Sequence, residues 1–191
     1  SEQSYLPSML RTTSYDTICH EHLEYYALRQ ILWMTDRAGL KIIDVTLNDV
    51  NGGSFAVTVA LRAAPYPEAT EKIQAILDEE DRVNLSSAAT YEAFSIRVAA
   101  HKNTLLETLR NIKARRKTVL GYGASTKGNV ILQYCGLSTA EIPCIAEVNE
   151  DKFGCVTPGT WIPIVSEADA KAGYLAFFLV LRWRLRDNLV A

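Results

Sequence analysis

Gly121-Tyr-Gly-Ala-Ser-Thr-Lys-Gly-Asn129 follows the apolar run Thr118-Val119-Leu120 and precedes Val130-Ile-Leu-Gln-Tyr-Cys135, which has the composition of a helix. This order predicts a strand, a glycine turn and a helix. Gly121 and Gly123 permit a tight turn and a close approach of the backbone to a ligand, because neither residue carries a Cβ atom.

The predicted turn is a candidate anion site. The amide groups at the start of the following helix are expected to face outward, with the positive end of the helix dipole behind them. A phosphate is the simplest ligand for this arrangement. The alternative interpretation is a turn whose glycines serve packing only, since the spacing is looser than that of the dinucleotide fingerprint. The candidate binding residues of the turn are Gly121, Tyr122, Gly123, Ser125, Lys127 and Asn129.

From Thr118 onward, strand-like and helix-like segments alternate, which predicts a small parallel α/β layer of the Rossmann-like kind. Glu147 ends the second predicted strand, where a dinucleotide-binding domain places the carboxylate that binds its ribose. Glu147 is therefore a further candidate ligand residue. The expected elements are strand 118–121, helix 126–135, strand 143–148, a strand near 162–165, helix 166–172 and strand 176–181.

The first part of the chain predicts a helix followed by an antiparallel hairpin. Helical spacing of apolar residues over 23–38 ends at Gly39, which suits a left-handed helix terminus. Strands are expected over 41–47 and 54–61, with a turn-rich connection between them. On the first strand, one face is expected to carry Ile43, Val45 and Leu47. The connection either lines a pocket with backbone amides or serves the turn alone, and its candidate residues are Asn51, Gly52, Gly53 and Ser54.

Pro65 and Pro67 mark a boundary, after which two helices are expected over 68–85 and 90–112. The expected organisation is thus a first part with the helix and the hairpin over 1–65, a helical connection over 66–112, and the α/β layer over 113–191. One stripe of the second helix carries the apolar residues Phe94, Val98, Leu105, Leu109 and Ile112, with His101 among them.

His20-Glu21-His22 is the most reactive cluster of the sequence. A strand would place both imidazoles on one face, whereas a helix would separate them by about 200°. A positioned histidine accepts a proton near neutral pH, so a general base is the favoured interpretation. A metal pair is the lesser alternative, because the sequence offers no evident third ligand nearby. Histidines without a function are also compatible with this pattern.

The composition excludes several classes of protein. A net charge of −2 gives no reason to expect nucleic acid or an anionic membrane as partner. No apolar run approaches the length of a spanning helix, and no signal peptide is visible. The four cysteines lack C-x-x-C pairs, so we expect no zinc cluster within the chain, and free thiols in a reducing cytoplasm.

Four stretches of the chain carry a resemblance to a known family. They are Tyr15-Asp-Thr-Ile-Cys-His-Glu-His-Leu-Glu-Tyr-Tyr26, Asn48-Asp-Val-Asn-Gly-Gly-Ser-Phe55, Gly121-Tyr-Gly-Ala-Ser-Thr-Lys-Gly-Asn129 and Ile145-Ala-Glu-Val-Asn-Glu-Asp-Lys-Phe-Gly154. Together they resemble the SAM-dependent C-methyltransferases that act on nucleotide sugars, best known for methylating C3 of dTDP-4-keto-deoxysugars. The resemblance covers nearly all of the chain. It implies the end of a class I methyltransferase domain, namely a helix plus a β-hairpin, followed by a Rossmann-like C-terminal domain.

The resemblance also implies a mechanism. His22 would act as the base, with His20 and Glu21 beside it, and Cys19 stands where some members carry a catalytic tyrosine. The enolate formed next to the ketone would take the methyl group of S-adenosylmethionine, and the glycine turn would help to hold the diphosphate. The SAM glycine motif and the zinc-binding N-terminal module of the family have no counterpart here, so we expect the chain alone to be inactive. An NAD- or nucleotide-binding Rossmann module without methyl transfer, or a structural domain, are the alternatives.

Overall fold

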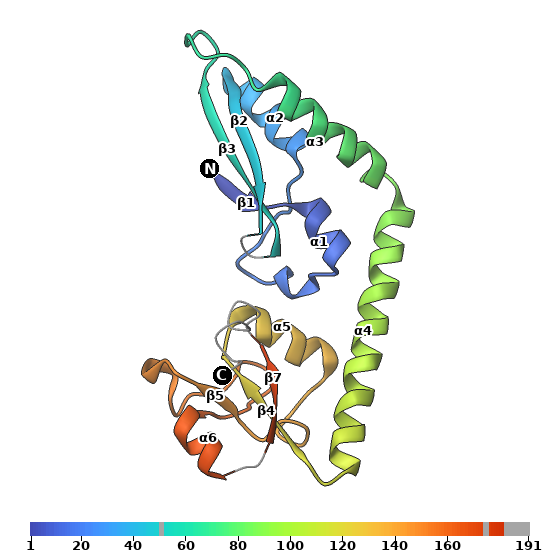
Figure 1. Cartoon of the computed structure of the whole chain (residues 1–191), viewed down its shortest axis with the longest axis vertical. Coiled ribbons are helices and arrows are strands. Elements are labelled where there is room, and N and C mark those ends of the chain that lie inside the picture. The colour runs from blue at the N-terminus through green and yellow to red at the C-terminus, as the bar shows by residue number, and fades with distance from the viewer. Residues whose placement is uncertain (50–51, 174–175, 182–191) are drawn as a thin grey trace. The chain divides into compact units, whose positions relative to one another are not determined.

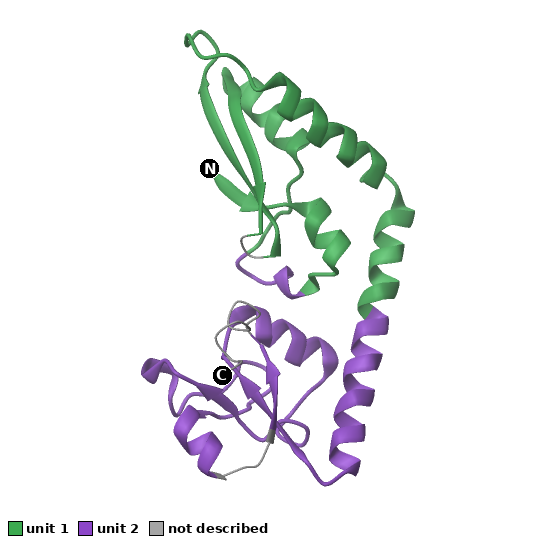
Figure 2. Ribbon diagram, viewed as in Figure 1, with its two compact units in different colours: residues 1–15, 22–98 green, residues 16–21, 99–191 purple. Residues whose placement is uncertain are grey.

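The structure, a computed structural model, describes residues 1–49, 52–173 and 176–181. It divides into two compact units, of which unit 1 comprises residues 1–15 and 22–98, and unit 2 comprises residues 16–21 and 99–191 (Figure 2). No helix among the described residues is long and apolar enough to cross a membrane.

Unit 1 contains an antiparallel sheet of three strands in the order β1-β3-β2 (Figure 1). Its strands are β1 (Glu2–Ser4), β2 (Leu40–Asn48) and β3 (Ser54–Leu61). The long hairpin of β2 and β3 confirms the predicted antiparallel pair, with Val45 opposite Val57. The short edge strand β1 was not predicted from the sequence.

The three apolar residues expected on one face of β2 differ in their burial. Ile42 and Val45 are buried, Ile43 is half-buried, and Leu47 is 51% exposed. The register of the β2–β3 pair shifts between Ile42 and Asp44. An extra residue in one strand resets the alternation of side chains, so a strict period of two fails across this point.

The helices of unit 1 are α1 (Leu6–Thr12), α2 (Leu28–Arg37) and α3 (Thr70–Val83), with a short 3₁₀ turn over Tyr15–Thr17. Gly39 has a φ of 69°, which confirms the left-handed residue expected after α2. The buried core that α2, α3 and the sheet share consists of Tyr5, Ala27, Leu28, Ile31, Ile42, Val45, Phe55, Val57 and Ile73.

Helix α2 begins later than the apolar spacing suggested, because its first amides are held by a residue from another helix. Glu80 of α3 is 2% exposed and accepts hydrogen bonds from the amides of Leu28 (2.6 Å) and Arg29 (3.2 Å). The residue before the helix, Ala27, has no side-chain oxygen with which to cap it. Glu80 also accepts from the Tyr5 hydroxyl, and burial followed by the charge of Glu80 raises the pKa of that phenol.

The long helix α4 (Ala88–Ala114) has residues in both units. In unit 1, Arg97 donates to the carbonyl oxygen of Leu10 (2.6 Å), and in unit 2, Lys102 donates to the carbonyl oxygen of Tyr134 (2.8 Å). Val98 and Leu109 are buried as the predicted stripe requires, whereas His101 is exposed.

Unit 2 confirms the predicted alternation of strands and helices. Among its described residues, four strands form a parallel sheet in the order β6-β5-β4-β7. The central strands β4 and β5 end at the glycine turn and at Glu147, so both sequence features lie at the carboxyl edge of the sheet. The elements are β4 (Thr118–Tyr122), α5 (Thr126–Cys135), β5 (Ile145–Glu147), a 3₁₀ turn (Glu150–Lys152), β6 (Ile164–Ser166), α6 (Glu167–Gly173) and β7 (Ala176–Val180).

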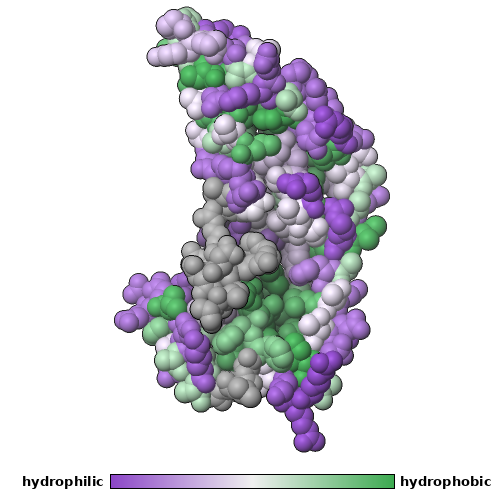
Figure 3. Space-filling model, viewed as in Figure 1, coloured by the Kyte–Doolittle hydropathy of each residue, from purple (hydrophilic) through white to green (hydrophobic). Residues whose placement is uncertain are grey.

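The main core of unit 2 lies between this sheet and the helices α4 and α5, and includes Leu109, Leu132, Ile145 and Ile162. Figure 3 shows hydrophobic residues gathered in the part of the view that unit 2 occupies. Exposed apolar side chains of this unit include Trp161, Phe177 and Phe178.

Candidate functional site

The glycine turn between β4 and α5 has the geometry that the sequence predicted. Gly123 has a φ of 80°, a value that favours glycine, and Ser125 caps α5 by accepting a hydrogen bond from the Gly128 amide (3.0 Å). The Ser125 hydroxyl also donates to the carbonyl oxygen of Leu181 (3.0 Å). These two hydrogen bonds of Ser125 fix the conformation of the turn.

Two glycines of this stretch are required by packing. A Cβ atom on Gly121 would lie 2.8 Å from a side-chain carbon of Ile145, and one on Gly128 would lie 2.8 Å from the Cβ of Leu181. These close approaches explain both glycines without a ligand. Binding of a ligand at the turn would therefore depend on the polar and charged groups around it.

Glu147 ties the end of β5 to the glycine turn. Its carboxylate is almost fully buried, and Oε2 accepts from the Ala124 amide (2.9 Å) and from the Lys152 ammonium (3.2 Å). Oε1 accepts from the amides of Val148 (2.8 Å) and Asn149 (3.2 Å). Burial alone would raise the pKa of this carboxyl, but these amides and Lys152 outweigh it and hold the pKa below its ordinary value.

These four donors use the acceptor positions that a carboxylate offers. A ribose hydroxyl would have to displace one of them from Glu147. The geometry therefore favours a positioning role, in which Glu147 holds the turn and Lys152 in place.

A pocket of about 410 Å³ opens beside the start of α5. Of the residues predicted to bind an anion, Ser125 and Asn129 line it, whereas Gly121, Tyr122, Gly123 and Lys127 are not among its lining residues. The full lining comprises Ala124, Ser125, Thr126, Asn129, Lys152, Thr157, Pro158 and Ile164.

Lys152 and Thr157 were missed as site residues by sequence reasoning. The Lys152 side chain is 36% exposed, and its ammonium donates to the carbonyl oxygen of Ala124 (2.8 Å), which places a cation at the pocket. Lys152 lies within the recognised stretch that begins at Ile145, and its position five residues after Glu147 was the available signal. Thr157 is buried and accepts from the Ile162 amide (3.0 Å), which shapes the opposite wall.

The His20-Glu21-His22 segment is neither strand nor helix but a turn. His20 and Glu21 are exposed and His22 is half-buried, so the two histidines have different surroundings. The His22 ring stacks on Tyr25 with a centroid separation of 6.5 Å and an interplanar angle of 26°.

His22 and Ser54 line a second pocket, of about 320 Å³, which lies in unit 1. Two candidate residues from distant parts of the sequence are thus brought together. Tyr26 donates to Glu24 in this pocket, and that hydrogen bond raises the pKa of the Tyr26 phenol. The complete lining is Glu2, Gln3, Ser4, His22, Glu24, Tyr26 and Ser54.

The remaining candidates of the hairpin connection serve the turn. Gly52 and Gly53 have φ values of 90° and 123°, and a Cβ on Gly53 would lie 2.5 Å from the Cβ of Ser8. Neither glycine is among the residues that line the pocket, and Asn51 lies outside the described residues.

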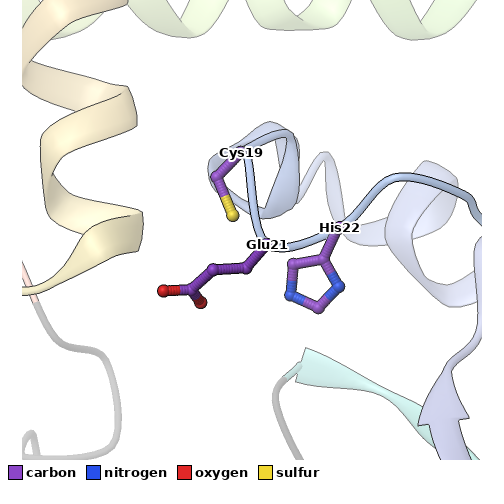
Figure 4. Close-up of side chains that lie close together, drawn as sticks. All are labelled: Cys19, Glu21 and His22. Atoms are coloured by element: carbon purple, nitrogen blue, oxygen red, sulfur yellow. The ribbon is translucent and has the colours of Figure 1, made fainter.

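The side chains of Cys19, Glu21 and His22 lie close together (Figure 4). One ligand atom from each side chain lies within 4.8 Å of the other two. The sequence suggested His20 and His22 as the alternative metal pair. In the structure the neighbours of His22 are instead Cys19 and Glu21, and His20 is not in the group. Glu21 also accepts a hydrogen bond from the Thr126 hydroxyl through Oε1 (3.1 Å).

The sequence of the chain also matches known proteins. Residues 49–191 match the family described as C-methyltransferase C-terminal domain, and the chain belongs to this family. A curated protein of Streptomyces niveus, the C-methyltransferase NovU, is 34% identical over 189 residues. That alignment covers 99% of this chain and 45% of NovU, so the chain spans about half the length of its relative. The resemblance to C-methyltransferases is thereby confirmed.

Proposed function

We propose that the chain is the C-terminal part of a SAM-dependent C-methyltransferase that acts on a nucleotide-activated keto-deoxysugar. The observation that carries the proposal is the match of 99% of the chain, including the His20-Glu21-His22 turn, to a C-methyltransferase. The reaction forms a carbon–carbon bond, so the enzyme needs a base that makes a carbon nucleophile.

His22 is the proposed base. A ketone acidifies the hydrogen on the neighbouring carbon, and a half-buried imidazole that lines a pocket is placed to remove it. The enolate then attacks the methyl group of SAM, and S-adenosylhomocysteine leaves. Glu2 and Glu24 line the same pocket as His22.

The pocket beside α5 is the proposed site for the diphosphate of the substrate. Lys152 supplies a cation, Thr126 and Asn129 supply hydrogen-bonding groups, and the start of α5 contributes the positive end of its dipole. In this proposal Glu147 positions Lys152 and the turn. The NAD-binding alternative would need the Glu147 carboxylate for a ribose, and four protein donors already occupy it.

Unit 1 is the proposed end of a class I methyltransferase sheet. Its order β1-β3-β2 places an antiparallel hairpin beside a short edge strand, and among the described residues no strand pairs with the outer edge of β1. A preceding part of the protein, corresponding to the length of NovU that this chain does not span, would supply the neighbouring strand and the SAM site, and zinc would belong to an N-terminal module.

The test is the product of the reaction. The longer protein that contains this chain is incubated with methyl-labelled SAM and a dTDP-4-keto-deoxysugar, and the product is analysed by NMR. We expect the label on the carbon next to the ketone. A label on an oxygen or nitrogen atom would contradict the proposed enolate chemistry, and transfer to a substrate without a nucleotide would contradict the substrate class.

A further inference from the structure

We infer that Cys19, Glu21 and His22 form a binding site for a thiophilic divalent cation such as Zn²⁺. The three side chains come from four consecutive residues, so the turn of the backbone itself gathers them (Figure 4). Thiolate, carboxylate and imidazole are the three kinds of side-chain ligand that zinc uses in proteins.

The spacing suits such an ion after a small adjustment. Tetrahedral zinc with bonds of about 2.0–2.3 Å holds its ligand atoms about 3.4–3.6 Å apart. The ligand atoms here lie within 4.8 Å of one another, so each must move by about 1 Å or less toward the centre. Glu21 is exposed and has a flexible side chain, which can make most of this movement.

The donor set leaves one position open. Three protein ligands around zinc are typical of sites that keep a fourth position for water or another small molecule. Among the described residues, Cys135, Cys144 and Cys155 are not part of such a group of metal-ligating side chains.

The site has a consequence that rests on the proposed function. The nitrogen lone pair of His22 cannot bind a metal and accept a proton at the same time. A divalent cation held by Cys19 and Glu21 therefore removes the proposed base, and micromolar Zn²⁺ inhibits the methyl transfer. Removal of the metal by a chelator restores the free imidazole.

Binding is tested on the 191-residue chain without SAM or sugar, so the result does not depend on the proposed reaction. Co²⁺ is the probe, because its bond to a thiolate gives a charge-transfer absorption band in the near ultraviolet. Zn²⁺ is then added in competition. The site variants are Cys19→Ser, Glu21→Gln and His22→Gln, and the matched controls are Cys155→Ser, an exposed thiol, and His20→Gln, the neighbouring imidazole.

We expect a band that titrates to one equivalent, disappears in Cys19→Ser, and needs at least about tenfold more Co²⁺ in Glu21→Gln and His22→Gln. The two controls retain the band and its affinity. Circular dichroism of each variant checks that it is folded. Because Glu21 is exposed, the Glu21→Gln variant leaves the core intact.

Three results would overturn the inference: no thiolate band in the parent chain, a band that survives in Cys19→Ser, or an equal loss in His20→Gln. If binding fails but methyl transfer still depends on His22, only the metal site is wrong. If binding succeeds and the longer protein transfers no methyl group, only the proposed function is wrong.

Discussion

Glu147 in unit 2 and Glu80 in unit 1 have the same physical task. Each is a buried carboxylate that accepts backbone amide hydrogens from a segment distant in the sequence. A buried charge is tolerated only when it is well hydrogen-bonded, so the two residues fix local geometry strongly. Sequence reasoning assigned one of them to a ligand and did not notice the other.

Glu147→Gln is predicted to destabilise unit 2 by about 2–3 kcal/mol, because an amide cannot accept from all four donors. The folded-state pKa of Glu147 is lowered, so its contribution is present above the ordinary carboxyl range and is lost as pH falls through the folded pKa. Urea unfolding of parent and variant between pH 3 and about pH 7 measures this difference.

Glu150→Gln is the matched control, because Glu150 is an exposed carboxylate close to the same turn. We expect its stability to stay near that of the parent at every pH. A Glu147→Gln chain as stable as the control at neutral pH would show that the four hydrogen bonds do not hold the turn.

At the scale of elements, α2 begins where Glu80 of α3 binds its first amides. Glu80→Gln is predicted to cost unit 1 about 2 kcal/mol, because the charge that favours the helix start is removed and the Tyr5 hydroxyl loses its carboxylate acceptor. The neighbouring Glu79→Gln is the control, since Glu79 forms an exposed ion pair with Arg82, worth less than about 1 kcal/mol. Equal losses in the two variants would contradict the capping role.

The turn before α5 yields a binding prediction. Titration of the ¹⁵N-labelled chain with dTDP is expected to shift the amides of Ser125, Thr126 and Asn129, with millimolar affinity, because an exposed helix dipole contributes only about 0.3–1 kcal/mol. Lys152→Gln should remove these shifts, whereas Lys102→Gln, at α4, should not. Stronger binding of NAD than of dTDP would favour the dinucleotide alternative.

The elements show where sequence reasoning succeeds and where it fails. The parallel layer was predicted because strand-like and helix-like segments alternate along the sequence, and Ser125 marks the start of α5. The start of α2 and the burial pattern along β2 were not predicted, because the first depends on Glu80 from another helix and the second on a register shift. The candidate site divides in the same way. His22 and Ser54 were found by motif. The position of Lys152 at the pocket and the grouping of Cys19 with His22 are visible only in the structure.

For the whole molecule, the chain belongs to the family of C-methyltransferase C-terminal domains and covers 45% of NovU. Its glycine turn lies in the layer of unit 2, beside a pocket with one cation, and not in unit 1. We therefore expect the isolated chain to bind SAM more weakly than about 10 μM. Calorimetric titration tests this, with S-adenosylhomocysteine as a second ligand. Tight binding would show that the cofactor site lies within these residues.

The central claim is that His22 makes the carbon nucleophile, and the decisive measurement is the turnover of the longer protein with His22→Asn. We predict a loss of about 10²–10⁴-fold, with SAM binding unchanged and with no exchange of the hydrogen next to the ketone in deuterated solvent. His20→Asn, in the adjacent exposed position, should retain turnover within a few-fold of the parent. A His22→Asn enzyme that transfers methyl groups and exchanges this hydrogen at the parent rate would contradict the account.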